Sequence, residues 1–395
     1  MKAKVAIARQ PPRYEPGLVR QSLAALGIDW RALIRPGDHV VLKPNLIREG
    51  HATRPAEWEQ IITHGTVIAA VAEQVRAAGG RLTICDAPQT DSDFDLICER
   101  TGIRHLDAEI LDLRREAWRT KDGVIVERRQ LPEDPRGYAL VDLAEQSCFA
   151  GKAGQFYGAD YDTDFTAQHH SQGRHEYLLS RTALDADVFI NLPKLKTHKK
   201  TGLTASLKNL VGINGDKNYL PHFCLGTPDE GGDEFPDSSV RHKVQSALLK
   251  KIKGGPWWTP TVKKVGAKLF GETGAVVRSG NWHGNDTTWR MVLDVNRAFF
   301  AKPRRYLAIV DAIVAGEGNG PLEADAKPCG VLLAGENPAA VDWVCARLMG
   351  FDWRKLPLVR EGLRQFGVAP ADVVANAGEP FHFAPHFGWK GQIEA

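Results

Sequence analysis

Short apolar runs and helical spacings alternate along the first half of the chain. Residues 4–8 and 39–42 are apolar runs, and leucines at positions 18, 23 and 26 have a helical spacing that stops at Gly27. Residues 66–78 carry apolar side chains on one helical face before a pair of glycines, and residues 82–85 are the next apolar run. This strand–helix–strand alternation is typical of parallel sheets. The pattern predicts an α/β fold with a doubly wound, mostly parallel sheet and helical insertions.

The second half of the chain continues this pattern. Residues 188–190 form a short apolar run bounded by polar residues, as in a buried parallel strand. Residues 306–310 and 331–334 predict two more strands, and a Gly-rich stretch at 316–321 predicts a loop after the first of them. Asn337 and Pro338 predict the start of a helix that runs to Met349.

Four segments follow from these patterns. We expect an N-terminal α/β half at 1–145, a central region with a basic motif and loops at 146–238, a helical insertion at 239–290, and a C-terminal half at 291–395 that completes the same fold. Residues 146–175 show no apolar periodicity and predict a long mobile loop. His51 and His64 have no metal-ligand spacing, so we interpret them as surface residues.

Polar side chains follow several of the predicted strands. In open α/β sheets, ligands bind outside the carboxyl ends of the strands, and lysine ammonium groups there suit a phosphate or a carboxylate. We predict Lys194, Lys196, His198, Asp311 and Glu317 as catalytic groups, and Lys43, Asn45, Lys208, Asn209, Lys217, Gly318 and Gly320 as groups that bind the ligand or a cofactor. Asp86 also ends a strand, and either a site role or a local turn cap fits it.

Asp311 and Glu317 introduce acidic groups into this basic set. Two carboxylates near one site can hold Mg²⁺ or serve as acid and base. The glycines between 316 and 320 would let backbone amides approach an anion closely. The sequence leaves the cofactor unknown; if a divalent ion binds, we expect magnesium, held by Asp311 and Glu317. For Asp342, inside the predicted last helix, a capping or packing hydrogen bond is the expected role.

The basic motif carries a family resemblance. The runs LPKLKTH at 192–198, TGLT at 201–204 and LKNLVG at 207–212 resemble the central motif of the domain of unknown function 362 (DUF362) family. Three further blocks agree in order: KPNL at 43–46, DAI at 311–313 with GEGNGP at 316–321, and AAVDW at 339–343. The resemblance implies a fold and a set of positions, including His222 shortly after a lysine, but no reaction. Some family members carry iron–sulfur ferredoxin segments.

Composition limits the classes of function. The chain has 395 residues, 43% of them hydrophobic and 25% charged, with a formal net charge of +3, which is ordinary for a globular protein and too small to indicate nucleic-acid binding. No apolar run is long enough to predict a membrane span. The six cysteines form no C-x-x-C pair, which argues against an iron–sulfur cluster in this chain. Scattered thiols also fit the reducing cytoplasm, where we expect the protein.

Three classes of function remain open from sequence. The first is an enzyme that acts on an anionic, phosphorylated or carboxylated small molecule, through acid–base, Schiff-base or metal-assisted chemistry. In layout, this variant is similar to the lactate racemase family, which uses a tethered nickel cofactor. The second is an iron–sulfur redox protein. The third is a binding or scaffold protein at a membrane surface, reached through an amphipathic helix with Trp258, Val262, Val265 and Leu269 on one face, although the same face would also fit a cap on the protein's own body.

Overall fold

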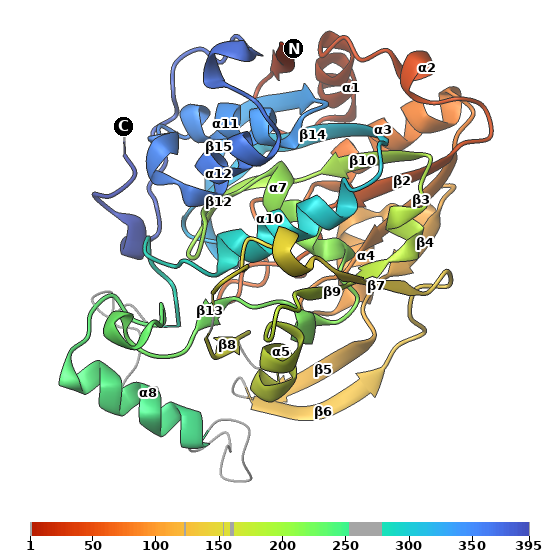
Figure 1. Cartoon of the computed structure of the whole chain (residues 1–395). Coiled ribbons are helices and arrows are strands. Elements are labelled where there is room, and N and C mark those ends of the chain that lie inside the picture. The colour runs from red at the N-terminus through yellow and green to blue at the C-terminus, as the bar shows by residue number, and fades with distance from the viewer. Residues whose placement is uncertain (1, 122–123, 153, 159–161, 253–278, 395) are drawn as a thin grey trace.

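A ten-stranded sheet forms the centre of the protein. The computed structural model describes residues 2–121, 124–152, 154–158, 162–252 and 279–394 (Figure 1). The main path of the sheet runs β16-β1-β15-β14-β10-β2-β3-β4, and β11 and β12 extend it beyond β14. The strands are β1 (Ala3–Arg9), β2 (His39–Pro44), β3 (Arg81–Asp86), β4 (Glu109–Asp112), β10 (Val188–Leu192), β11 (Lys194–His198), β12 (Gly202–Thr204), β14 (Arg305–Asn319), β15 (Glu323–Gly335) and β16 (Val373–Val374).

Most neighbouring strands of this sheet are parallel. Strand β10 lies between β2 and β14 and is parallel to both, and β2, β3 and β4 continue in the same direction. The antiparallel part consists of β14, β15 and β1, together with the pair β11 and β12. The predicted α/β class with a mostly parallel sheet is confirmed.

Helices cover both faces of the sheet. Helices α1 (Pro16–Ala25), α3 (Gly65–Ala77) and α4 (Phe94–Thr101) pack in one apolar core. Helices α7 (Ser206–Asn209), α10 (Thr288–Phe299), α11 (Pro338–Leu348) and α12 (Pro357–Gln365) pack in the other. Side chains of β10 alternate between them: Val188 and Ile190 belong to the first core and Phe189 to the second.

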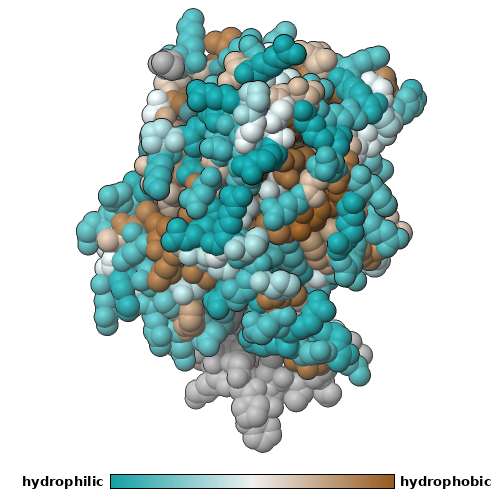
Figure 2. All heavy atoms as spheres, turned by 90° about the vertical axis from the view of Figure 1, so that its right-hand side faces the viewer, coloured by the Kyte–Doolittle hydropathy of each residue, from teal (hydrophilic) through white to brown (hydrophobic). Residues whose placement is uncertain are grey.

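Smaller elements surround these layers. They are the helices α2 (Trp30–Leu33), α5 (Thr163–His169), α6 (Arg181–Leu184) and α8 (Val240–Ile252), and the strand pairs β5 (Glu116–Lys121) with β6 (Val124–Gln130), β7 (Tyr138–Asp142) with β9 (Glu176–Ser180), and β8 (Phe156–Tyr157) with β13 (Phe223–Cys224). Figure 2 shows a face covered mainly by hydrophilic residues, with hydrophobic ones gathered in a few patches. No helix in the described part of the chain is both long enough and apolar enough to cross a membrane.

Three predictions about local structure need correction. The Gly-rich loop expected at 316–321 is wrong, because β14 continues to Asn319 and pairs with β15 as far as Glu323. The expected loop at 146–175 is also wrong in part, since it contains β8 and α5, and His170 and His175 are buried. Lys194 and Lys196, expected among the loops of the central region, lie in β11, whose five residues are all buried. In each case, backbone pairing with distant segments decides the structure, and local composition does not reveal it.

Two other predictions are confirmed at residue level. Asn337 caps α11, and its side-chain oxygen accepts hydrogen bonds from the backbone N–H groups of Ala339 and Ala340. The helices predicted to end near Gly27 and Gly79 are α1 and α3, and both glycines have positive φ. The amphipathic helix expected around Trp258 lies outside the described residues.

Phe189 tests the importance of the central strand. Its ring is fully buried and meets Phe299 edge-on, with 4.6 Å between ring centroids. We expect Phe189→Ala to lower the free energy of unfolding by about 3–5 kcal/mol, because the cavity lies in a packed core. Val374→Ala, on a side chain that is 49% exposed, should change it by less than about 0.5 kcal/mol. Urea unfolding measures both, and equal effects would contradict this account of the core.

Candidate functional site

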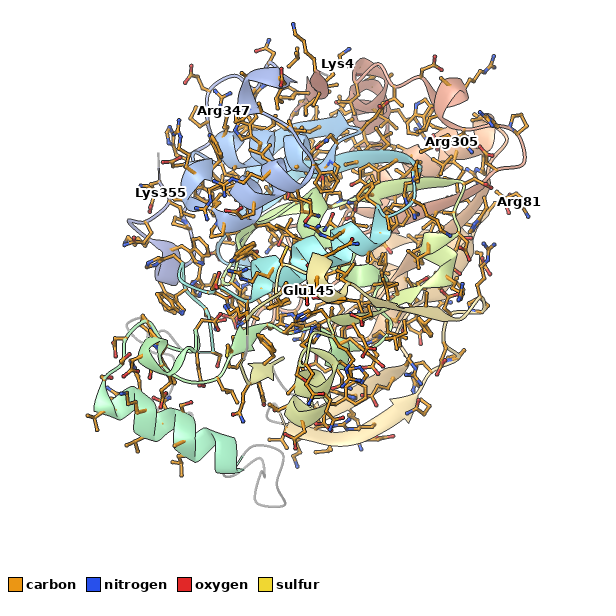
Figure 3. All side chains as sticks on the ribbon, in the orientation of Figure 1. Lys4, Arg81, Glu145, Arg305, Arg347 and Lys355 are labelled. Atoms are coloured by element: carbon orange, nitrogen blue, oxygen red, sulfur yellow. The ribbon has the colours of Figure 1, made fainter. Side chains whose placement is uncertain are left out.

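Most of the predicted site residues lie at or near the carboxyl ends of the parallel strands. The opposite ends carry Arg81 and Arg305, which lie on the right-hand side of the molecule in Figure 3. At the carboxyl end of β2, Lys43 is almost fully buried, and its Nζ lies 2.6 Å from Asp86 Oδ1 at the end of β3. Asp86 also accepts hydrogen bonds from the backbone N–H groups of Leu46 and Ala87. Asp86 is therefore the counter-ion of Lys43.

A glycine makes room for this ion pair. A Cβ atom built on Gly212 would lie 2.0 Å from Asp86 Oδ1 and 2.6 Å from Lys43 Nζ. Only glycine fits at this position without displacing the pair. The Gly212 of the basic motif therefore serves close packing. Gly215, a few residues further on, donates its N–H to Leu178 O.

A second ion pair lies at the junction of β11 and β14. Lys194 Nζ lies 2.6 Å from Asp311 Oδ2, and both side chains are inaccessible to water. Tyr14 Oη donates a hydrogen bond to Asp311 Oδ1 at 2.9 Å and accepts one from Lys194 Nζ at 2.7 Å. The backbone N–H groups of His64 and Ile313 also donate to Asp311. Asp311 thus has a full set of donors, which lets its charge stay buried.

Tyr14 and His64 are parts of this region that the sequence did not reveal. Their rings stack with 3.7 Å between centroids, and Trp58 stacks on the other side of His64 at 4.9 Å. His64 Nδ1 accepts the N–H of Thr66 and so caps α3. The interpretation of His64 as a surface residue is wrong, and so is that of His51, which is 4% exposed. Tyr14 and its carboxylate partner Asp311 are 297 positions apart in the chain, so no local sequence pattern indicates their contact.

A chain of amide side chains links the core to Lys196. Asn191, at the end of β10, accepts a hydrogen bond from Asn209 Nδ2 at 2.7 Å, and Asn209 Oδ1 accepts one from Asn45 Nδ2 at 2.9 Å. Asn45 Oδ1 then accepts from Lys196 Nζ at 3.1 Å, and Ile61 O is a second acceptor for the same ammonium group. These bonds fix the amide orientations and place Lys196 without any carboxylate partner among the described residues.

Lys208 lies in the short helix α7, whose first turn is held by Asp342. Asp342 accepts hydrogen bonds from the N–H groups of Ser206 at 2.6 Å and Leu207 at 3.2 Å. Burial raises the pKa of the Asp342 carboxyl to about 8. The expected capping role of Asp342 is confirmed. Lys208 itself is partly exposed, and no residue of the described chain forms a hydrogen bond or ion pair with its Nζ.

Lys208 stands at the centre of what we call the cationic cluster. The cluster comprises Lys43, Lys196, Lys208, Lys217, His198 and His222. Burial, followed by the charge of Lys43, lowers the pKa of Lys208 to about 8. The positive charge of Lys208 in turn contributes to lowering the pKa values of Lys196, Lys217, His198 and His222, after burial as the largest cause for each. Within the described chain, positive groups outnumber carboxylates in this region.

The two histidines of the cluster differ in protonation pattern. His198 Nδ1 accepts hydrogen bonds from the backbone N–H groups of Lys200 and Thr201, so Nε2 carries the proton of the neutral ring. His222 Nδ1 lies 2.8 Å from Leu220 O, to which it donates, so its Nε2 has the lone pair. Burial lowers the pKa of His198 well below its usual value and that of His222 to about 3. The cluster therefore includes one neutral imidazole donor and one neutral imidazole acceptor.

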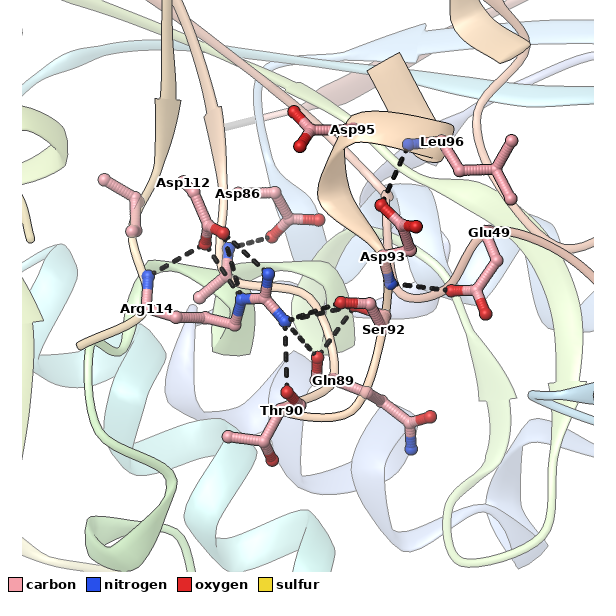
Figure 4. Close-up of polar contacts among 12 residues, drawn as sticks. Glu49, Asp86, Gln89, Thr90, Ser92, Asp93, Asp95, Leu96, Asp112 and Arg114 are labelled. Atoms are coloured by element: carbon pink, nitrogen blue, oxygen red, sulfur yellow. Dashed lines mark hydrogen bonds and ion pairs between the residues drawn. The ribbon is translucent and has the colours of Figure 1, made fainter. Parts of the chain in front are cut away.

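The loop that follows β3 holds Lys217 in its place within the cationic cluster. Lys217 Nζ donates to Ala87 O at 2.8 Å, directly after Asp86. Figure 4 shows how the guanidinium of Arg114 secures this loop. Arg114 donates to the carboxylate of Asp112 and to the carbonyl oxygens of Gln89, Thr90 and Ser92. Arg114 is 3% exposed. No sequence pattern indicated its role, because most of its partners are carbonyl oxygens of a loop.

Glu317, Gly318 and Gly320 do not join the cluster. Glu317 lies six residues beyond Asp311 on β14, about 20 Å for a fully extended strand, and pairs with Lys327 at 3.1 Å. Gly318 donates its N–H to Ala384 O, and Gly320 donates to Gly318 O. Asp311 and Glu317 are therefore not brought together as a magnesium site. No group of three or more His, Cys, Asp or Glu residues in the described part of the chain is arranged to hold a metal ion.

These features define an α/β protein with a buried cationic cluster at the carboxyl edge of its sheet. The chain belongs to the family described as domain of unknown function (DUF362), whose model matches residues 144–347. This match contains Lys194, Lys196, His198, Lys208 and His222. The predicted family membership is confirmed.

Two known proteins show more distant similarity. The thylakoid-associated protein sll1697 of Synechocystis sp. is 28% identical over 347 residues, which cover 87% of this chain and 74% of that protein. The lactate racemase apoprotein of Thermoanaerobacterium thermosaccharolyticum has a TM-score of 0.33 and 10% identity, over 87% of this chain and 56% of the racemase chain. Neither similarity assigns a reaction to this chain.

The buried pair Lys43–Asp86 should contribute strongly to stability. We expect Lys43→Met to lower the free energy of unfolding by about 3–5 kcal/mol, because it leaves the buried Asp86 carboxylate without its counter-ion. Arg20→Met removes the exposed pair between Arg20 and Glu73 and should have a much smaller effect, because water screens an exposed pair. Urea unfolding of both variants tests this. Similar losses in the two would show that the buried pair has no special role.

Proposed function

We propose that this protein is an enzyme that acts on an anionic small molecule, phosphorylated or carboxylated, at the cationic cluster. One observation carries the proposal: Lys208 is partly exposed, is surrounded by other positive groups, and has no hydrogen-bond or ion-pair partner in the described chain. A charge that is largely withdrawn from water normally has a partner, because desolvation without one is costly. A bound anion would supply the missing negative charge.

The electrostatics of the cluster favour a dianion over a monoanion. Lys196, Lys208 and Lys217 all have lowered pKa values and no carboxylate within ion-pair distance among the described residues. Each lysine that is protonated in the bound state adds a charge-assisted hydrogen bond, worth about 1.5–3 kcal/mol. Phosphate esters and dicarboxylates are the metabolite classes that offer such charge.

The same groups provide for proton transfer. An enzyme lysine whose pKa is lowered to about 7–8 is suited to general acid–base chemistry near neutral pH. The Lys208 pKa of about 8 falls in this range, and that of Lys217 is about 7. The neutral rings of His198 and His222 add a donor and an acceptor. We therefore assign Lys208 as the leading candidate for proton transfer and Lys196 as an anchor of the anion.

Cytoplasmic location is part of this proposal. All six cysteines are unpaired, and four of them are buried. Burial raises the pKa of Cys85 and of Cys345, so both stay as thiols at neutral pH. Such residues need no oxidising compartment.

Removal of the Lys208 ammonium tests the site. We expect Lys208→Ala to weaken binding of pyrophosphate or oxalate by about tenfold to a hundredfold, the equivalent of one charge-assisted hydrogen bond. Lys208→Arg should recover part of this affinity, since it keeps the charge but not the compact shape. Lys302→Ala, on an exposed lysine far along the chain, serves as the matched control. Calorimetric titration measures affinity, and circular dichroism checks the fold.

The proposal fails if Lys208→Ala binds both anions as well as Lys302→Ala does while both variants keep the wild-type spectrum. It also fails if the wild-type protein binds neither pyrophosphate nor oxalate. Lys208 is preferred to Lys196 for this test because Lys196 is fully buried and bonded to Asn45 and Ile61. Its removal would disturb the fold as well as the site.

The pKa of Lys208 sets an expected pH dependence. The ammonium form binds an anion, so a bound anion raises a pKa that the free protein holds at about 8. Affinity for sulfate, whose charge is constant over this range, should therefore be highest below pH 8 and fall as pH rises above it. Binding near pH 8 should take up protons, which calorimetry in buffers of different ionisation enthalpy detects. Affinity that is constant from about pH 7 to 9 would exclude this role for Lys208.

A further inference from the structure

Helix α8 (Val240–Ile252) differs from the other helices in its surroundings. It projects from the body of the protein, at the lower left of Figure 1. Its attachment is polar: Gln245 and Ser246 are buried, and Ser246 Oγ donates a hydrogen bond to Glu234 Oε2 at 2.8 Å. This contact sets which face of α8 meets the body and which faces outward.

The outward face of α8 is an apolar stripe. Val240, Val244 and Leu248 follow one another at a spacing of four residues and are 77%, 61% and 42% exposed. Residues four apart lie on one face of a helix. The described residues include six exposed large hydrophobic side chains, and three of them form this stripe. Isolated exposed apolar residues are ordinary, but an aligned set on a projecting helix indicates a contact surface.

The helix is also strongly basic. Its sequence VRHKVQSALLKKI has four Lys or Arg residues and no Asp or Glu. Lys243 pairs with Asp229 on the neighbouring segment, and Arg241 is exposed. From sequence alone, residues 240–278 contain nine Lys or Arg and one Glu, whereas the rest of the chain contains 42 basic and 47 acidic residues. The positive excess of the whole chain is therefore concentrated in this region.

We propose that α8 docks the protein onto an anionic lipid surface. An interfacial helix lies in the plane of the bilayer with its apolar face among the acyl chains and its cations at the lipid phosphates. The stripe of Val240, Val244 and Leu248 supplies the apolar face, and the basic residues of α8 supply the cations. A second copy of the chain fits less well, because two α8 helices packed through their stripes would bring like charges together. The proposal is independent of the cationic cluster and of the function proposed for it.

Vesicle flotation of the full chain tests this proposal. The vesicles contain phosphatidylcholine with about one third phosphatidylglycerol, or phosphatidylcholine alone. We expect the protein to float with the anionic vesicles and to remain below the neutral ones, and about 0.5 M NaCl should release much of it because salt screens the attraction. The triple variant V240S/V244S/L248S should lose at least about tenfold in the bound-to-free ratio, since it removes the buried apolar area.

A matched control uses the other exposed apolar residues. The variant V126S/L140S/V374S changes the same number of exposed hydrophobic side chains away from α8 and should float as the wild type does. Circular dichroism checks that both triple variants are folded. Lys208→Ala should also float normally, which separates a failure here from a failure of the anion site.

Three outcomes would overturn the proposal. The wild-type protein could fail to float with anionic vesicles, or float equally with neutral ones, or the α8 triple variant could float as well as the control variant. Light scattering tests the alternative that a second copy of the chain covers the stripe. A dimer that the α8 triple variant abolishes, without vesicle binding by the wild type, would assign the stripe to a second copy of this chain and not to lipid.

Discussion

The cost of taking lysine ammonium groups out of water governs the carboxyl edge of this sheet. Lys43, Lys194 and Lys196 are all less than 2% exposed, and an isolated buried ammonium is far too costly for a stable fold. Each therefore has dedicated partners: Asp86 for Lys43, Asp311 with Tyr14 for Lys194, and Asn45 with Ile61 O for Lys196. Gly212, Asn209 and Asn191 follow from these pairings, because they make room for the partners or orient them.

The presence or absence of a carboxylate partner distinguishes the structural lysines from the lysine that we assign to the functional site. Lys43 and Lys194 have buried carboxylates, so their charges are neutralised inside the protein. Lys208 is partly exposed and lacks such a partner in the described chain, although Asp342 and α7 hold its backbone in place. A charged group that the fold holds in place without a neutralising partner is typical of a binding site, where the ligand supplies the opposite charge. This contrast, and not the number of lysines, supports the proposed function.

Sequence patterns predicted the sheet and much of the cluster because these depend on local periodicity. The strand ends placed Lys43, Lys196 and Lys208 in one region, and the structure brings them together. Tyr14 was missed, since its partner Asp311 is 297 residues away in the chain. Residues 316–319 were misread because glycine is typical of loops, yet these residues belong to β14 and pair with β15 in a long antiparallel ladder.

The order of strands in the sheet also governs how the site comes into being. Strand β10 lies between β2 and β14, so the central three strands come from positions around 40, 190 and 305 of the chain. Contacts between segments so far apart in sequence form late and slowly in folding. Lys43 on β2 and Asp311 on β14 lie at the same edge of the sheet only when both strands have joined β10. The site at this edge is complete only when the whole sheet has formed, so a ligand bound there would report on the assembly of the whole sheet.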